Sequence, residues 1–208
     1  NHTYRSKEEE HWRKASGLLL LKMATGKKNK DLAIEIKLHE NVNAQLDETS
    51  LTLKGPKGEV KREFKDKVIK FEHKDGSIRL KAPKFSKINK KRIKSHAAHI
   101  RNMIRGCMEA HKYTLKICSG HFPMSVSVSN EQFIVKNFLG EKVPRTLKLK
   151  TGASVKVEGN LVVVESPSKE IAGQVSADIE QLTRRTHYDG RIFQDGIWIV
   201  TKDGKEIE

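Results

Sequence analysis

Residues 32–38, Leu-Ala-Ile-Glu-Ile-Lys-Leu, carry large apolar side chains at every second position. This period of two is typical of a β-strand with one buried face. Two hairpins are predicted after it, turning at residues 55–58, Gly-Pro-Lys-Gly, and at residues 75–76, Asp-Gly. The first part of the chain therefore predicts antiparallel strands that bury one face.

The apolar period changes from two to that of a helix farther along the chain. One stripe recurs at steps of three and four residues, at Ile93, Ala97, Ile100, Ile104, Cys107 and His111. A stripe with this spacing predicts an amphipathic helix whose apolar face covers the sheet. Strands followed by one covering helix define a two-layer α+β domain, which we expect over residues 31–112.

The second half of the chain repeats this plan. Strands are predicted at residues 115–117, 124–128, 133–135, 143–149, 154–157 and 161–164. A helix is expected after residues 166–168, Ser-Pro-Ser, with its apolar stripe at Ile171, Val175, Ile179 and Leu182. Residues 54–59, Lys-Gly-Pro-Lys-Gly-Glu, also match residues 136–141, Lys-Asn-Phe-Leu-Gly-Glu, 82 positions later. We therefore predict an α+β fold of two tandem similar domains, each an antiparallel-rich sheet with one helix packed on a face.

Two segments fall outside these repeated patterns. Residues 1–30 are predicted to form an N-terminal extension, with a possible helix over about residues 7–24 and then a basic linker. Because Met23 would make an ordinary start, we expect residues 1–22 to be absent from the mature protein. The second domain is expected over residues 113–186, and residues 187–208 are predicted to form a C-terminal tail with one short strand.

The charge of the chain is strongly positive and uneven. The 208 residues include 41 Lys and Arg against 26 Asp and Glu, a formal net charge of +15. Residues 1–112 hold 28 basic and 14 acidic side chains, whereas residues 113–208 are nearly neutral. A positive excess of this size predicts a polyanionic partner, and nucleic acid is the usual one. The longest apolar run, Leu18–Leu21, is too short for a membrane span, and two cysteines make no disulfide framework. We expect a soluble intracellular protein with no membrane partner.

The densest basic stretch lies between the last predicted strand of the first domain and its helix. Residues 81–94 contain seven Lys and Arg and no acidic residue. A loop held at both ends lays such cations against a phosphate backbone and releases condensed counterions. The predicted contacts with RNA are Lys84, Lys87, Lys90, Lys91 and Arg92. A solvated loop without a partner is the alternative.

Catalytic and metal-binding patterns are missing from the sequence. The histidines and cysteines between residues 96 and 121 fit no compact zinc spacing. No G-x-S-x-G turn, no carboxylate pair and no G-K-[ST] phosphate loop is present. We therefore predict neither an enzyme nor a bound cofactor or metal. Aromatic residues make up 6% and are not spaced like the stacking platforms of single-strand RNA readers, which favours folded, double-helical RNA.

Four segments occur in an order that points to a known family. They are residues 99–106, His-Ile-Arg-Asn-Met-Ile-Arg-Gly; 120–124, Gly-His-Phe-Pro-Met; 137–142, Asn-Phe-Leu-Gly-Glu-Lys; and 193–197, Phe-Gln-Asp-Gly-Ile. With these motifs the chain resembles the universal large-subunit ribosomal protein L-six family, called L-nine in eukaryotes. The resemblance runs from around Asp31 to the C-terminus. The form of the last motif is most similar to the archaeal and eukaryotic branch.

The resemblance implies a structural, non-enzymatic protein of the cytoplasmic ribosome. It implies two similar α+β domains and binding to large-subunit rRNA near the sarcin–ricin loop and the translation-factor site. The expected partners are large-subunit rRNA and neighbouring ribosomal proteins, with translation factors nearby. A free-standing basic RNA-binding or RNA-chaperone module acting off the ribosome is the alternative.

Basic side chains in and near the last two motifs are candidate RNA contacts. They are Lys142, Arg145, Arg184, Arg185 and Arg191. The first two follow Gly140, which is expected to adopt a backbone conformation closed to other residues. The other three flank a turn at Gly190 and are predicted to bind one RNA backbone. For Arg184 and Arg185, a favourable interaction with a helix C-terminus, worth about 0.3–1 kcal/mol, is an equal alternative.

Overall fold

The chain divides into two compact units, which are described separately. The computed structural model describes residues 32–47, 50–66, 68–74 and 76–207, so the predicted N-terminal helix and linker lie outside the described residues. One unit ends at Ile104 and the other begins at Arg105, earlier than the boundary expected after residue 112. The end of helix α2 (Lys87–Met108) belongs to the second unit, where Gly106 approaches the backbone carbonyl of Pro167.

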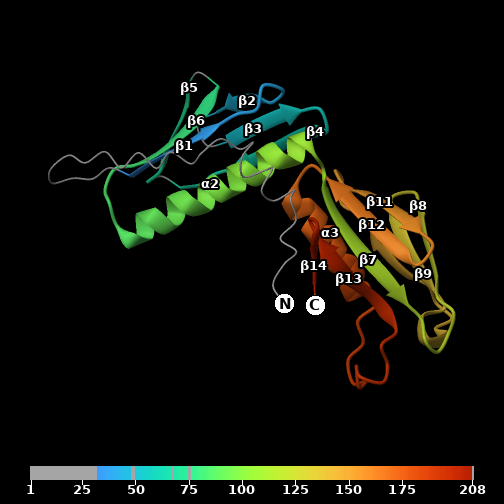
Figure 1. Ribbon diagram of the computed structural model, residues 1–208. Coiled ribbons are helices and arrows are strands. Elements are labelled where there is room, and N and C mark those ends of the chain that lie inside the picture. The colour runs from blue at the N-terminus through green and yellow to red at the C-terminus, as the bar shows by residue number, and fades with distance from the viewer. Residues whose placement is uncertain (1–31, 48–49, 67, 75, 208) are drawn as a thin grey trace, which may run out of the picture. The chain divides into compact units, whose positions relative to one another are not determined.

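Two antiparallel three-stranded sheets form the β layer of the first unit (Figure 1). The strand bounds are Leu32–Lys37 for β1, Asn43–Leu46 for β2, Ser50–Gly55 for β3, Gly58–Glu63 for β4, Lys70–Lys74 for β5 and Ser77–Ala82 for β6. The strand orders are β1-β6-β5 and β2-β3-β4. The predicted first strand and both predicted hairpins are confirmed, since β3 pairs with β4 and β5 with β6. Strand β2 escapes prediction because its only large apolar residue is Leu46.

Helix α2 buries the stripe that the sequence predicts. Ile93, Ala97 and Ile100 are fully buried. The helix starts after Ser86, whose Oγ accepts a hydrogen bond from the Asn89 N–H at 3.0 Å and so caps the first turn. The stripe ends sooner than expected, because the helix stops at Met108 and the next element begins a few residues later.

The placement of His111 on this helix is therefore wrong. His111 is the first residue of strand β7 (His111–Cys118), where its side chain is fully buried. The spacing of His111 from Cys107 fits the last position of a helical stripe. It fits equally well a buried position at the start of a strand, so the sequence does not distinguish the two.

The second unit contains one five-stranded and one three-stranded antiparallel sheet. The further strands are β8 (Ser125–Ser129), β9 (Gln132–Lys136), β10 (Arg145–Lys148), β11 (Ser154–Glu158), β12 (Leu161–Ser166), β13 (Gly196–Lys202) and β14 (Lys205–Glu206). Their orders are β11-β12-β7-β13-β14 and β10-β9-β8. Helix α3 (Lys169–Leu182) packs on β7, β12 and β13 and buries Ala172, Val175 and Ile179 (Figure 1). The predicted α+β fold of two tandem units is confirmed. No helix of the described residues has the length and apolarity that a membrane span requires.

Strand β13 lies inside the larger sheet of the second unit. It is paired with β7 on one side and with β14 on the other, and Ile197 is fully buried. From the sequence these residues are predicted as part of a tail, because the partner strand β7 lies far earlier in the chain. The local alternation of apolar residues predicts that β13 is a strand, but it does not predict that β7 is its partner.

Asp203, in the turn between β13 and β14, joins several elements of the second unit. Its carboxylate accepts hydrogen bonds from His111 Nδ1 at 2.8 Å, Lys169 Nζ at 3.1 Å and Arg105 Nη1 at 3.1 Å. Burial opposes ionisation of Asp203, but the bonds from His111 and Lys169 outweigh it and hold its pKa well below the ordinary value. The charged carboxylate thus connects α2, β7 and α3 through one residue.

Candidate nucleic-acid interface

Three loops meet at one end of the second unit. We call this region the motif end and define it as residues 118–123, 137–142 and 184–196. Asn137 Nδ2 donates a hydrogen bond to the Pro123 carbonyl at 3.0 Å. Arg185 Nη2 donates to Glu141 Oε1 at 2.9 Å. Three of the four motifs found in the sequence therefore lie together.

Asp195 binds the loop that follows β7. Its Oδ1 accepts hydrogen bonds from the backbone N–H groups of Gly120 at 2.6 Å and His121 at 3.1 Å, and its Oδ2 accepts one from His121 Nδ1 at 2.5 Å. Burial opposes ionisation of Asp195, but these hydrogen bonds outweigh it and lower its pKa. A carboxylate oxygen accepts hydrogen bonds, so His121 Nδ1 is the donor in this contact. The second ring nitrogen, Nε2, makes no hydrogen bond to the described residues.

The turn at residues 137–140 has an unusual backbone. The short 3-10 helix η1 (Phe138–Gly140) follows Asn137, and the φ angles of Asn137, Leu139 and Gly140 are 59°, 47° and 79°. Gly140 adopts the left-handed conformation that the sequence predicts. Asn137 and Leu139 adopt it despite their side chains, so surrounding contacts must hold the turn. The ring of Phe122 packs over Gly140, and Phe138 is buried beneath the turn.

Arg145 supplies several of these contacts. Its Nε and Nη2 donate to the two oxygens of Glu141 at 2.8 and 2.7 Å, and its Nη1 donates to the Leu182 carbonyl at 2.6 Å. The guanidinium carbon lies 4.4 Å from the centroid of the Phe138 ring. The hydrogen bonds from Arg145, helped by the charge of Arg185, hold the pKa of Glu141 below its usual range despite partial burial. A contact between Arg145 and RNA stays a prediction that this geometry does not favour, because its donors point into the unit.

Arg185 and Arg191 are paired to different degrees. Besides its bond to Glu141, Arg185 places its guanidinium carbon 5.0 Å from the centroid of the Tyr188 ring. The guanidinium of Arg191 forms two hydrogen bonds with Asp189, yet the Arg191 side chain is 91% exposed. An exposed ion pair is worth little, so a phosphate can displace the Asp189 carboxylate from Arg191.

Lys142 and Arg184 are exposed side chains at the motif end. Neither forms an ion pair with any residue that the structure describes. Arg184 follows the last turn of α3, and its backbone N–H donates to the Gln181 carbonyl at 3.1 Å. Both the RNA contact and the helix-terminus interaction therefore stay open for Arg184.

A second group of cations lies in the first unit. We call Lys84, Lys87, Lys90 and Lys91 the α2-start cluster. The sequence predicts a loop here, but the helix already begins at Lys87 and its first turn has no acidic residue. The lysines therefore stand at the positive end of the helix dipole, an arrangement that is unfavourable until an anion binds. Arg92, one residue further, has its Nη1 3.8 Å from Asp66 Oδ1.

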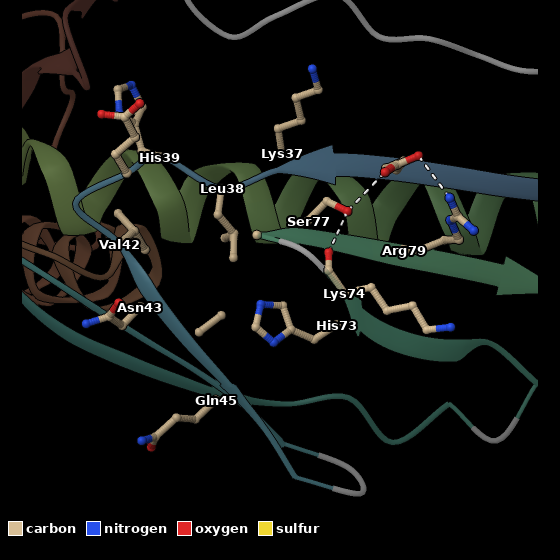
Figure 2. A pocket seen from close by; sticks show the side chains of 14 residues that line it. Lys37, Leu38, His39, Val42, Asn43, Gln45, His73, Lys74, Ser77 and Arg79 are labelled. Atoms are coloured by element: carbon tan, nitrogen blue, oxygen red, sulfur yellow. Dashed lines mark hydrogen bonds and ion pairs between the residues drawn. The ribbon is translucent and has the colours of Figure 1, made fainter.

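A wide hollow of about 1060 Å³ lies beside β1, β2 and the β5–β6 turn in the first unit (Figure 2). On its rim, Glu35 accepts hydrogen bonds from Ser77 Oγ at 3.0 Å and from Arg79 Nη2 at 3.3 Å. Lys37 and His73 point in different directions in Figure 2. The cations of this hollow do not converge on one point, so we assign it no role in phosphate binding.

Sequence reasoning missed the pairing of Asp195 with His121 and the acids beside the predicted arginines. Asp195 and His121 are 74 positions apart, so no local spacing could join them. The only signal was that each belongs to one of the motifs. Glu141 and Asp189, in contrast, lie within four residues of Arg145 and Arg191. That proximity was a usable signal for internal ion pairs.

Comparison with known proteins places these features in one family. The family description "Ribosomal protein L6" matches residues 39–110 and again residues 122–196. The large ribosomal subunit protein uL6 of Methanosarcina mazei is 41% identical over 173 residues, which cover 83% of this chain and 98% of that relative. The uL6 proteins of Nanoarchaeum equitans and Natronomonas pharaonis are 42% and 36% identical, over 83% and 80% of this chain and 94% of each relative.

Two α+β repeats that match the same family twice define a structural ribosomal protein rather than an enzyme. The chain belongs to the ribosomal protein L6 family. This confirms the resemblance found in the sequence, including its archaeal side, since all three relatives are archaeal. It also confirms the expected location at the ribosome.

Proposed function

We propose that this chain is a structural constituent of the large ribosomal subunit and binds large-subunit rRNA near the factor-binding region, without a cofactor. The observation that carries the proposal is the similarity over 98% of the length of the Methanosarcina mazei large ribosomal subunit protein uL6. The net charge of +15 supports an RNA partner, because each phosphate contact releases counterions. Neighbouring ribosomal proteins are the further partners, and translation factors bind nearby.

The proposed phosphate contacts are the cations without a firm internal partner. They are Lys84, Lys87, Lys90 and Lys91 in the first unit and Lys142, Arg184 and Arg191 in the second. Arg92 and Arg185 share an acid within the fold and are secondary contacts. Arg145 is a positioning residue that holds the motif end. Contacts of this kind recognise the shape and backbone of folded RNA rather than its sequence.

Cosedimentation with purified large subunits tests the proposal. The full chain should stay with the large subunit in salt that removes loosely bound basic proteins, and it should not pellet with small subunits. Crosslinking in the same particles should join rRNA to the motif end and to the α2-start cluster. Release from the subunit together with tight binding to free RNA would favour the alternative, an RNA-binding or chaperone module that acts off the ribosome.

A further inference from the structure

We propose that a small hollow at the motif end binds one unpaired nucleobase of the RNA. This inference rests on the proposed function, which makes RNA the partner of the motif end. The hollow lies entirely within the second unit, between the loop that follows β7 and the loop that precedes β13. The residues that carry the argument are Ser119, His121, Ile192 and Gln194.

The size of the hollow fits a single base. Its volume is about 310 Å³. Pockets for small ligands have volumes of roughly 300–1,000 Å³, so this one is at the lower end of that range. A stretch of double helix is too large for it, whereas one base that has left its stack can enter.

The walls offer the surfaces that a flat, uncharged ring prefers. Ile192 is large and apolar, yet it is 65% exposed, so it has apolar surface to bury against a ligand. The His121 ring lines the hollow and is supported from behind by Phe193, with centroids 5.0 Å apart and an interplanar angle of 28°. Tyr188 meets Phe193 edge-on at the same centroid distance. Nucleobases stack on flat rings such as that of His121 whatever their sequence.

The polar atoms of the walls match the edge of a base. The Ser119 hydroxyl, the side-chain oxygen Oε1 of Gln194 and His121 Nε2 have no hydrogen-bond partner among the described residues. Together they can donate and accept, and every nucleobase presents both donors and acceptors on its edge. No Lys or Arg of the described part of the chain lines the hollow, although the chain is strongly basic. A phosphate group is therefore a poor occupant, and a neutral ring is a good one.

Hydrogen bonds already hold these walls in place. Asp195 fixes the position of His121 and of the backbone at residue 120. The Trp198 indole Nε1 donates to the Gln194 carbonyl at 3.0 Å, and the Ile192 N–H donates to the Asp189 carbonyl at 3.1 Å. A base that enters does not have to order the two loops, which lowers the entropic cost of binding.

The first test uses the full chain and mononucleotides as probes. The amide signals of Ser119, His121 and Gln194 are followed by NMR during titration with AMP, GMP, CMP and UMP at millimolar concentration. Ribose 5-phosphate is the matched probe that lacks a base. We expect shifts with at least one nucleotide and none with ribose 5-phosphate. Equal shifts with ribose 5-phosphate, or no shift with any nucleotide, would overturn the base pocket.

The second test measures binding of large-subunit rRNA. Ile192→Ser should weaken binding roughly tenfold, the scale expected for the loss of one base-stacking interaction. The control is Leu161→Ser on β12, which removes another exposed apolar side chain and should leave binding unchanged. Unchanged binding by Ile192→Ser, with the wild-type chain still bound to rRNA, would overturn the pocket and leave the proposed function standing. Failure of the wild-type chain to bind rRNA would overturn both.

Discussion

The α2-start cluster and the motif end both present cations, but they hold them in different ways. The lysines of the cluster lie just before and within the first turns of α2, and the first turn contains no acidic residue. At the motif end, Arg145 and Arg185 share Glu141, and Asp195 binds His121. The ion pairs of Glu141 and Asp195 therefore hold the shape of the loops at the motif end, whereas the lysines of the cluster are available to a partner.

The two regions therefore contribute different properties to RNA binding, affinity and selectivity, which a count of charges in the sequence does not distinguish. Free lysines supply affinity that depends on salt and hardly on the RNA sequence. Loops fixed by hydrogen bonds supply a surface of defined shape, which selects where the protein binds. We expect changes to the α2-start cluster to alter the affinity for RNA. Changes to the residues that hold the loops of the motif end should alter the shape of its binding surface.

The largest effect should come from removing the residue that ties the second unit together. Asp203→Ala leaves His111 fully buried and without its carboxylate. Loss of one partner of a buried pair costs about 3–5 kcal/mol, so the free energy of unfolding in urea should fall by this amount. Asp178→Ala, which removes a partly exposed carboxylate 3.4 Å from Lys150, is the control and should cost less than about 1 kcal/mol. Equal losses of unfolding free energy for the two variants would mean that the hydrogen bonds of Asp203 do not stabilise the second unit more than a partly exposed ion pair does.

Glu141→Ala should reveal whether the arginines of the motif end serve the fold or the RNA. It removes the carboxylate shared by Arg145 and Arg185, and we expect a loss of about 2–3 kcal/mol in the free energy of unfolding. Binding of large-subunit rRNA should weaken, because the turn at residues 137–140 loses its support. Tighter binding by the variant would show instead that Glu141 competes with phosphate for these arginines. Glu165→Ala, near an exposed lysine on the larger sheet, is the matched control.

The α2-start cluster should affect affinity without affecting stability. Replacing Lys84, Lys87 and Lys91 by Ala should lower the slope of log K against log salt by up to about 2.7, near 0.9 for each lost phosphate contact. The control replaces Lys112, Lys116 and Lys156, three exposed lysines of the second unit, and changes the net charge equally. A slope reduced equally by both triple variants would mean that net charge, and not the cluster, sets the affinity.

Acid should weaken the motif end before it affects the cluster. The pKa of Glu141 is lowered in the folded chain, so its contribution to stability is present above the unfolded value, about 4.3, and is lost as the pH falls through the folded pKa. In this window, Glu141→Gln should flatten the dependence of unfolding free energy on pH by up to about 1.4 kcal/mol per pH unit. Urea unfolding at several pH values measures this pH dependence. Parallel curves of unfolding free energy against pH for the variant and the wild type would contradict a lowered pKa of Glu141 in the folded chain.

The smallest effect is expected for Lys142, the exposed lysine of the motif at residues 137–142, Asn-Phe-Leu-Gly-Glu-Lys. Lys142→Ala should reduce the salt slope by about 0.9 and leave the unfolding free energy unchanged. Lys142→Arg keeps the charge and should keep the slope. If Lys142→Ala binds rRNA with the wild-type slope, Lys142 is not a phosphate contact.

The sequence predicts those parts of the structure that depend on local patterns. The periods of two and of three to four place most strands and both helices, and the glycine at position 140 marks a left-handed turn correctly. Contacts between distant segments are not encoded in such patterns. The partner of β13, the burial of His111 on a strand and the Asp195–His121 pair all depend on the tertiary fold.

For the candidate site, too, the sequence does not show which basic side chains are bonded within the fold. Arg145 and Lys142 look alike as cations near one glycine turn, yet Arg145 is 23% exposed and bonded within the fold, whereas Lys142 is exposed. A count of charges cannot separate them. The acid four residues before Arg145 could have done so, because such spacing permits an internal ion pair.

Gly106 shows how tightly the end of α2 is matched to its surroundings. A Cβ atom at this position would overlap the backbone carbonyl of Pro167, which cannot rotate away as a side chain would. Any replacement must therefore move the whole turn that leads into α3, and with it Lys169 and its bond to Asp203. At this point of the protein a single hydrogen atom is the largest substituent that the second unit tolerates.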